Sequence, residues 1–125
     1  MKNLYHFILD DHFRNPRNSR FLDAAHIKLT NVNPLCGDII NIQTCYHNGI
    51  LTEIGIQADG CVISVATASL LSEHVLQKQI AEIEAINEQV ICNLIGMELG
   101  PTRLKCALMG LKALLCTINE LKKSC

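Results

Sequence analysis

Hydrophobic and polar residues alternate along two neighbouring runs in the first half of the chain. The alternating positions are Ile40, Ile42, Thr44 and Tyr46 in the first run and Thr52, Ile54, Ile56 and Ala58 in the second. A period of two residues predicts two β-strands, each with one face toward the core. Asn48-Gly49 lies between the runs and predicts a tight hairpin, because a type I′ turn needs positive φ at both central residues.

The hairpin also predicts which residues face each other. If Asn48 and Gly49 are the central turn residues, Tyr46 faces Leu51, and the same register continued along the strands places Cys36 opposite Cys61. Glycines interrupt the continuation, so we expect proximity of the two cysteines rather than a ladder pair. Residues 25–32 also alternate and stop at Asn33-Pro34, which predicts a first strand and therefore a three-stranded antiparallel meander.

Helical spacing dominates the rest of the chain. Residues 3–13, with Leu4, Phe7 and Ile8 at helical spacing, predict a short amphipathic helix before Asn15-Pro16. Residues 61–76 are small or apolar nearly all round, as in a helix buried against a sheet. Residues 79–95 predict one amphipathic helix closed by Gly96, and residues 100–102 (Gly-Pro-Thr) start a last helix. The expected fold class is α+β: the sheet packed with an N-terminal helix and three or more C-terminal helices.

Composition narrows the class of protein. The 125 residues are 49% hydrophobic and 18% charged, which fits a single domain over residues 1–125 with a mainly aliphatic core. A net charge of −1 and only five aromatic side chains, two Tyr and three Phe, argue against nucleic-acid binding. We find no export signal and no run of about 18 apolar residues that could span a membrane. We therefore expect a cytoplasmic protein with no membrane partner.

Seven cysteines are the main candidates for chemistry: Cys36, Cys45, Cys61, Cys92, Cys106, Cys116 and Cys125. The odd count argues against a disulfide framework, and no C-x-x-C pair is present. The meander brings Cys36, Asp38 and Cys61 to one end of the sheet. Cys106 lies about 130° from the centre of the apolar stripe of the last helix, and in its first turns, where the helix dipole favours a thiolate.

These four residues admit several interpretations. Three thiolates and one carboxylate suit tetrahedral Zn²⁺ or an iron-sulfur cluster held less tightly than by four thiolates. The cysteines can instead be separately buried, since free cysteine is among the most buried residue types. A disulfide between Cys36 and Cys61 is sterically conceivable but disfavoured in a reducing cytosol. A nucleophilic cysteine needs a histidine oriented toward it, and the five histidines form no motif.

Other residues receive simpler expectations. Cys45, Cys92 and Cys116 are expected in the core and Cys125 at a frayed terminus. Asp59 is a candidate cap of the following helix. Lys105 is either solvated or an electrostatic helper of neighbouring thiolates. His26 and His74 are expected at the surface or as caps.

Four segments together resemble a known family. "YHFILDDHFRNPRN", "NPLCGDII", "DGCVISVATASLL" and "KCALMGLKAL" resemble, in order and over nearly the whole chain, the U-type iron-sulfur cluster scaffold family of IscU, SufU and the N-terminal domain of NifU. The family's three cysteines and aspartate fall on Cys36, Cys61, Cys106 and Asp38. The resemblance implies a SufE/IscU-like fold.

It also implies a function. Such a protein accepts persulfide sulfur from a pyridoxal-phosphate-dependent cysteine desulfurase, assembles a transient [2Fe-2S] cluster and transfers it to apo iron-sulfur proteins. Cys36, Cys61 and Cys106 would be sulfur-accepting thiols and ligands, Asp38 a labile oxygen ligand, and Lys105 an auxiliary residue. Zn²⁺ often occupies the same ligands, so the alternative is a zinc-dependent sulfur acceptor that stimulates a desulfurase. Either protein is a carrier rather than an enzyme.

The chain departs from the family pattern at three places. The family's G-x-G-C is Ala58-Asp59-Gly60-Cys61, without the first glycine. Lys105 is similar to the SufU-like branch, whereas the spacing of 45 positions from Cys61 to Cys106 is similar to the IscU-like branch. Residues 99–103, Leu-Gly-Pro-Thr-Arg, stand where IscU-like members carry a Leu-Pro-Pro-Val-Lys segment for an Hsp70-type chaperone, so the match to that partner is weak.

Overall fold

A three-stranded sheet and five helices make up the computed structural model, which describes residues 2–32 and 37–123. In chain order the elements are α1 (Lys2–Arg14), β1 (Ile27–Val32), β2 (Ile39–His47), β3 (Ile50–Asp59), α2 (Val62–Val75), α3 (Ile80–Glu84), α4 (Glu88–Ile95) and α5 (Pro101–Lys123). The strands are antiparallel in the order β1-β2-β3. The predicted meander and the α+β class are confirmed.

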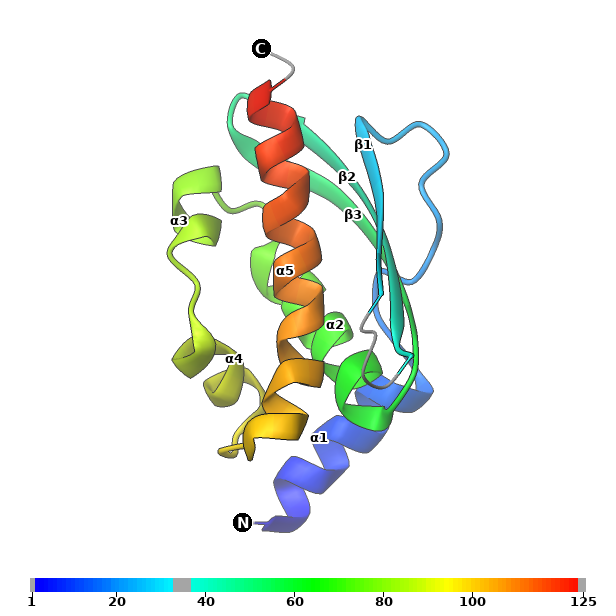
Figure 1. Cartoon of the computed structure of the whole chain (residues 1–125), viewed down its shortest axis with the longest axis vertical. Coiled ribbons are helices and arrows are strands. Elements are labelled where there is room, and N and C mark those ends of the chain that lie inside the picture. Colours follow the sequence, from blue (N-terminus) through cyan, green and yellow to red (C-terminus); the bar gives the residue numbers. More distant parts are fainter. Residues whose placement is uncertain (1, 33–36, 124–125) are drawn as a thin grey trace.

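The helices lie in layers on one face of the sheet (Figure 1). Helices α2 and α5 pack directly against the strands, and α3 and α4 lie on the side of these two helices away from the sheet. Helix α1 packs on α2. The core between these layers is aliphatic, as the composition predicts. Its largest fully buried side chains include Ile40 and Ile42 of β2, Leu71 of α2 and Leu114 of α5.

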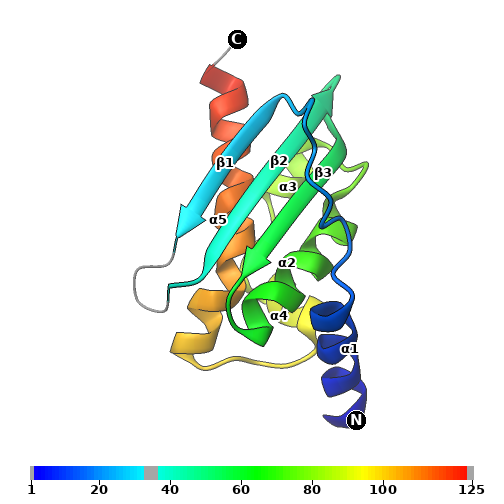
Figure 2. The same cartoon turned by 90° about the vertical axis from the view of Figure 1, so that its right-hand side faces the viewer.

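The chain between α1 and β1 covers the other side of the sheet (Figure 2). The backbone N–H of Ile56 donates to the Asn18 carbonyl at 2.7 Å, and the Leu22 N–H donates to the Gln43 side chain at 3.4 Å. Gly55 makes this approach feasible, because an added Cβ would lie 2.4 Å from the Arg20 carbonyl oxygen. This segment therefore covers the part of the second face along β3, and leaves β1 open there.

The hairpin turn matches its prediction, but the register does not continue unchanged. Asn48 and Gly49 have φ of 53° and 77°, and Tyr46 pairs with Leu51 as expected. Cys45 then pairs with Glu53, so Thr52 is an extra residue in a β-bulge. Beyond the bulge the register differs by one position from the predicted one.

The bulge corrects two expectations. Leu51, which is fully buried, joins Ile54 and Ile56 on the core face, and Thr52 is only half-buried. The last pair of the ladder is Ile39 with Asp59, so the uniform register that placed Cys36 opposite Cys61 is one residue off. Cys36 itself lies outside the described residues.

Residues 79–95 form two helices, not the single one predicted. Helix α3 ends at Glu84, and the Asn87 side chain caps α4 by accepting from the Val90 N–H at 3.1 Å. Asn is a strong N-cap residue, and its extended backbone (φ −127°) interrupts the helix. Gly96 ends α4 in the left-handed conformation and Pro101 begins α5, both as predicted.

Helix α1 exposes a side chain that was expected on its apolar face. Phe7 is 72% exposed, whereas Leu9 and His12 are buried. The orientation follows from polar contacts to α2: the His12 Nδ1 lies 2.7 Å from the Ser69 hydroxyl, which also accepts from the Arg17 N–H. Within the described part of the chain, no helix combines the length and apolar character that crossing a membrane requires.

Candidate metal and sulfur site

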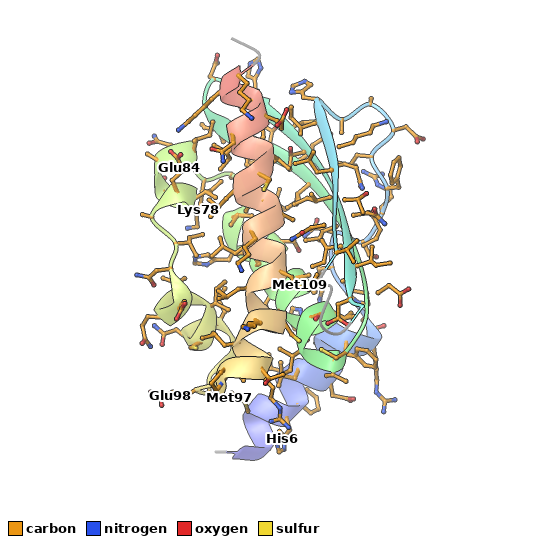
Figure 3. The ribbon with its side chains drawn as sticks, in the orientation of Figure 1. His6, Lys78, Glu84, Met97, Glu98 and Met109 are labelled. Atoms are coloured by element: carbon orange, nitrogen blue, oxygen red, sulfur yellow. The ribbon has the colours of Figure 1, made fainter. Side chains whose placement is uncertain are left out.

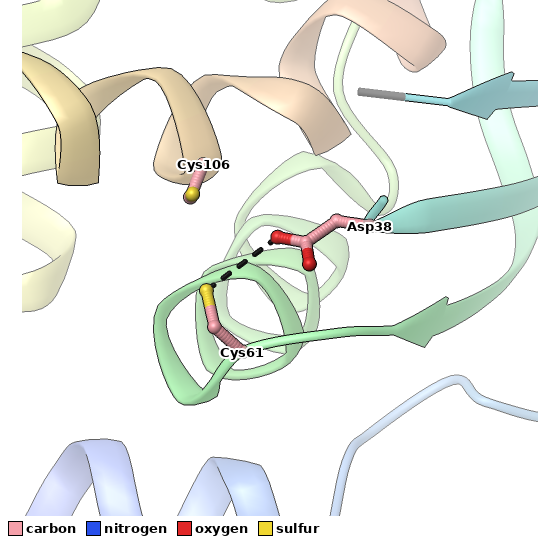
Figure 4. A group of neighbouring side chains, drawn as sticks. All are labelled: Asp38, Cys61 and Cys106. Atoms are coloured by element: carbon pink, nitrogen blue, oxygen red, sulfur yellow. Dashed lines mark hydrogen bonds between the residues drawn. The ribbon is translucent and has the colours of Figure 1, made fainter. Parts of the chain in front are cut away.

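Three predicted site residues meet at one end of the sheet (Figure 4). Asp38 directly precedes β2, Cys61 directly follows the turn after β3, and Cys106 lies in the second turn of α5. One ligand atom from each residue lies within 4.8 Å of the other two. The structure thus brings together three of the four residues, while the fourth, Cys36, is outside the described residues.

The three side chains differ in their access to solvent. Asp38 is 4% exposed and Cys106 is 8% exposed, whereas Cys61 is exposed. The Cys61 thiol donates to Asp38 Oδ2 at 3.5 Å, shown by the dashed line in Figure 4. The site therefore has a buried oxygen and a buried sulfur on its inner side and an accessible sulfur on its outer side.

Cys61 is also the N-cap of α2. Its sulfur accepts from the backbone N–H of Ser64 at 3.5 Å, the position that a Ser or Asp oxygen takes in an ordinary cap. Asp59, the residue expected as an alternative cap, is the exposed last residue of β3 and does not cap the helix. The start of α2 thus holds a sulfur atom at its positive end, where anionic groups are favoured.

Gly60 makes room for the buried carboxylate. A Cβ at this position would lie 2.2 Å from Asp38 Oδ1, 2.4 Å from its Cγ and 2.9 Å from its Cβ. Residue 60 needs to be glycine for steric reasons alone, because its φ is not positive. In the family's G-x-G-C pattern, the glycine that this chain retains is the one beside the cysteine.

Ser64 is a site contact that the sequence did not predict. Its hydroxyl donates to Asp38 Oδ2 at 2.5 Å and lies 3.3 Å from the Cys61 sulfur. The spacing Cys-x-x-Ser, with the cysteine at the N-cap and the serine three residues later, is the sequence signal that could have found it.

Both cysteines open on a pocket of about 560 Å³. Its walls come from α1, from the start of α2, and from the segment that leads into α5; they include Leu9, Ile63 and Met97. His6, Thr102 and Arg103 supply its polar groups. Figure 3 labels His6 and Met97 at this end of the molecule. The thiols therefore face a largely apolar space that is open to solvent on one side.

Three of the other cysteines were placed wrongly from the sequence. Cys116 is exposed, and Cys45 and Cys92 are half-buried rather than in the core. The position of Cys116 on α5 falls just outside the stripe that α5 buries against α2 and the sheet. Cys125 lies outside the described residues. Lys105 is exposed on α5, so its expected role as an electrostatic helper stays a prediction.

Two histidines make side-chain contacts outside the group of candidate ligands. His12 is buried, and burial lowers its pKa, as does the positive charge of Arg17, against the opposite effect of Glu73. His26 is exposed, as expected, and its Nδ1 accepts from the Tyr46 N–H at 3.2 Å. Neither histidine belongs to the group of three ligand atoms.

The donor set fits a thiophilic metal. Two thiols and one carboxylate oxygen suit Zn²⁺ or iron, which take a fourth ligand in a tetrahedral site. Gly60 leaves the space that the Asp38 carboxylate occupies, and the hydrogen bond from Ser64 fixes the orientation of that carboxylate. When bound, such an ion would supply Lewis acidity and hold the thiols as thiolates.

Fold and site together define a small α+β domain with two thiols and a carboxylate, the donor set of a candidate metal site, at one end of its sheet. The chain belongs to the NifU-like N-terminal domain family, whose model matches residues 4–124. This confirms the resemblance to the U-type scaffolds.

Individual relatives cover most of the chain. The mitochondrial iron sulfur cluster assembly protein 1 of Eremothecium gossypii is 32% identical over 93% of this chain and 77% of its own length. The iron-sulfur cluster assembly scaffold protein IscU of Haemophilus influenzae is 32% identical over 90% of each chain. The zinc-dependent sulfurtransferase SufU of Bacillus subtilis is 30% identical over 89% of this chain and 86% of its own length.

Solved structures show the same fold. The N-terminal part of a NifU-like protein from Brucella abortus has a TM-score of 0.82 over 99% of this chain and 98% of its own, at 14% identity. A putative scaffold protein for the SUF system from Fervidobacterium islandicum has a TM-score of 0.75 over 89% of this chain and 93% of its own, at 20% identity.

Proposed function

We propose that this protein is a scaffold for iron-sulfur cluster assembly. It accepts sulfur from a pyridoxal-phosphate-dependent cysteine desulfurase, builds a labile [2Fe-2S] cluster as its cargo, and passes the cluster to apo-proteins. Cys36, Cys61 and Cys106 are the proposed sulfur-accepting thiols and ligands, and Asp38 is the proposed oxygen ligand. The protein is a carrier, and we place it in the cytoplasm, where a reducing environment keeps its thiols free.

One observation carries this proposal: ligand atoms of Asp38, Cys61 and Cys106 lie within 4.8 Å of one another although the residues come from three distant segments. Separately buried cysteines would have no reason to converge on a buried carboxylate. The names of the E. gossypii and H. influenzae relatives describe cluster assembly and support the same function.

The exposure of Cys61 suits it to receive sulfur. A thiolate that attacks the outer sulfur of a donor persulfide takes up that sulfur, and the donor cysteine leaves as a thiolate, so no external oxidant is needed. The Ser64 N–H, which already donates to the Cys61 sulfur, would stabilise the attacking anion. A thiol reductant would then supply the two electrons that release this sulfur as sulfide, and Cys106, beside Cys61 but buried, would serve as a ligand to the iron that the sulfide bridges.

Exposed apolar side chains that are neighbours in sequence of site and pocket residues support docking of a protein donor. Phe7, Ile39 and Val62 are all exposed, and they directly follow His6 of the pocket wall, Asp38 and Cys61 in the chain. Exposed apolar groups that gather around a site are typical of protein interfaces. The desulfurase and the apo-protein acceptors are the proposed partners at this surface.

Asp38 explains why the cargo can leave. A carboxylate oxygen is a harder and weaker ligand for iron than a thiolate, and it holds the cluster less tightly than a fourth cysteine would. On the proposal that the carboxylate assists release of the cluster more than it assists retention, we expect a cluster on Asp38→Ala to persist longer than on the wild type.

A second candidate function is a zinc-dependent sulfur acceptor that stimulates a desulfurase without building a cluster. The observation that favours it is the 30% identity with the B. subtilis zinc-dependent sulfurtransferase. Lys105 before Cys106 is a further similarity to that branch. In this function Zn²⁺ would hold Asp38 and the thiols until sulfur arrives.

Anaerobic reconstitution separates the two functions. Wild type, Asp38→Ala and Cys106→Ser are mixed with ferrous iron, cysteine, a desulfurase and a thiol reductant, and absorption and metal content are followed. The scaffold proposal expects a [2Fe-2S] spectrum in the wild type, its loss in Cys106→Ser, slower decay in Asp38→Ala, and transfer to an apo-ferredoxin. Retained zinc, no cluster and an accelerated desulfurase would refute the scaffold and support the sulfur acceptor.

A further inference from the structure

We propose that Ser64 is a positioning residue of the site, which orients Asp38 so that one carboxylate oxygen faces the two thiols. This inference rests on the proposed metal- and sulfur-binding function. Ser64 lies in the first turn of α2, is 1% exposed, and contacts side chains of both Asp38 and Cys61.

Two separate donors of Ser64 reach two different ligand atoms. The hydroxyl donates to Asp38 Oδ2 at 2.5 Å, and the backbone N–H donates to the Cys61 sulfur at 3.5 Å. When Cys61 is a thiolate, both bonds persist, because neither needs a proton from the cysteine. A single residue thus ties the carboxylate and the exposed thiol to the start of one helix.

The carboxylate is held at both oxygens. Oδ1 packs against Gly60, where a Cβ would lie only 2.2 Å away, and Oδ2 receives the Ser64 hydroxyl. An ionised carboxylate oxygen can accept more than one contact, so the hydrogen bond leaves Oδ2 a further lone pair. Oδ2 is also the oxygen that the Cys61 thiol contacts. Asp38 is therefore presented as a ligand through one oxygen, in a fixed orientation.

Groups that orient metal ligands usually change metal affinity by about 10- to 100-fold when they are removed. Ser64→Ala removes only the hydroxyl and leaves the backbone N–H bond to Cys61 in place, so it isolates the contact to Asp38. Ser64→Thr keeps a hydroxyl at the same position. Ser72 provides a matched control, because it is a fully buried serine of the same helix whose hydroxyl donates to the Ser69 carbonyl.

The test measures affinity for Zn²⁺ and for Co²⁺ by chelator competition, together with the Co²⁺ absorption spectrum, in the full chain. We expect Ser64→Ala to bind about tenfold more weakly or worse, with a Co²⁺ spectrum that moves toward that of Asp38→Ala. Ser64→Thr and Ser72→Ala should keep wild-type affinity and spectrum. In the Asp38→Ala background, Ser64→Ala should cause no further loss, since the hydroxyl then has no carboxylate to orient.

Two results would overturn the inference: wild-type affinity in Ser64→Ala, or an equal loss from Ser64→Ala with and without Asp38. Both leave the scaffold proposal standing. A wild-type chain that binds neither metal overturns this inference and the proposed site together. If the Ser64 variants show the expected metal affinities but the wild type forms no cluster on reconstitution, the role of Ser64 is supported and only the scaffold function is refuted. Urea denaturation with a chelator present reports whether each variant is folded.

Discussion

Replacing Gly60 by alanine tests the steric basis of the site. The new Cβ would lie 2.2 Å from Asp38 Oδ1 and 2.4 Å from its Cγ, whereas ordinary contacts begin at 3.4 Å. Asp38 is buried and held by Ser64, so it cannot simply swing into solvent. Either the carboxylate retreats by about 1 Å or the turn before α2 shifts, and both separate Asp38 from the two thiols.

The size of the effect follows from these contacts. Overpacking of a well-packed site costs about 1–3 kcal/mol, and a buried carboxylate oxygen that loses its donor costs about 1–3 kcal/mol more. Reduced chain entropy in the unfolded state offsets about 0.4–1 kcal/mol of this. We expect Gly60→Ala to lower the free energy of unfolding by about 1–6 kcal/mol and to weaken Zn²⁺ binding by roughly 10- to 100-fold.

Urea denaturation with a chelator present measures the first quantity, and chelator competition measures the second. Gly100→Ala is the matched control, because a Cβ there meets no atom within 4 Å. Its stability and affinity should remain close to wild type. Wild-type Zn²⁺ affinity in a folded Gly60→Ala chain would show that Asp38 does not depend on this gap, and the steric argument would be wrong.

Three further changes test the fold, each measured by urea denaturation. Asn87→Ala should cost about 1 kcal/mol by removing the cap of α4, and an unchanged midpoint would contradict the helix break. Leu114→Ala should cost about 2–5 kcal/mol because the side chain is fully buried, and a cost below 1 kcal/mol would argue against this core. Burial and the positive charge of Arg17 lower the pKa of His12 below 6.5 in the folded chain. The unfolded chain therefore takes up a proton on this histidine at a higher pH than the folded chain does, and the free energy of unfolding should fall as the pH drops below about 6.5. His12→Gln should reduce that loss, with His74 contributing the remainder in the same direction, whereas an identical pH profile would refute the role of His12.

Local sequence was sufficient for most of the elements, residues 79–95 excepted, and for the end of the sheet where the site lies. Alternation and Asn48-Gly49 predicted the hairpin, and Gly96 and Pro101 predicted where α4 ends and α5 begins. These signals act within a few residues, through backbone conformation and side-chain periodicity, so they can be read without tertiary contacts. Antiparallel topology then placed the residue before β2 and the residue after β3 at the same end.

Tertiary packing decided the rest. The extra residue Thr52 moved the register by one, and with it the neighbours of Asp38, because the buried Leu51 and Ile54 must both face the core. Phe7 and Cys116 were misplaced for a related reason. Periodicity shows that a helix has an apolar face, but the neighbouring helices determine which part of that face is covered.

Tertiary packing also decides the contacts that shape the site. Asp38, Gly60 and Ser64 come from two chain segments, and their fit depends on the hydrogen bond from the Ser64 hydroxyl to the Asp38 carboxylate and on the space that glycine leaves at position 60. The sequence by itself determined that a carboxylate and cysteines share one end of a three-stranded sheet. Only the tertiary structure decided which atoms meet there, because side-chain distances depend on how strands and helices pack across the whole core.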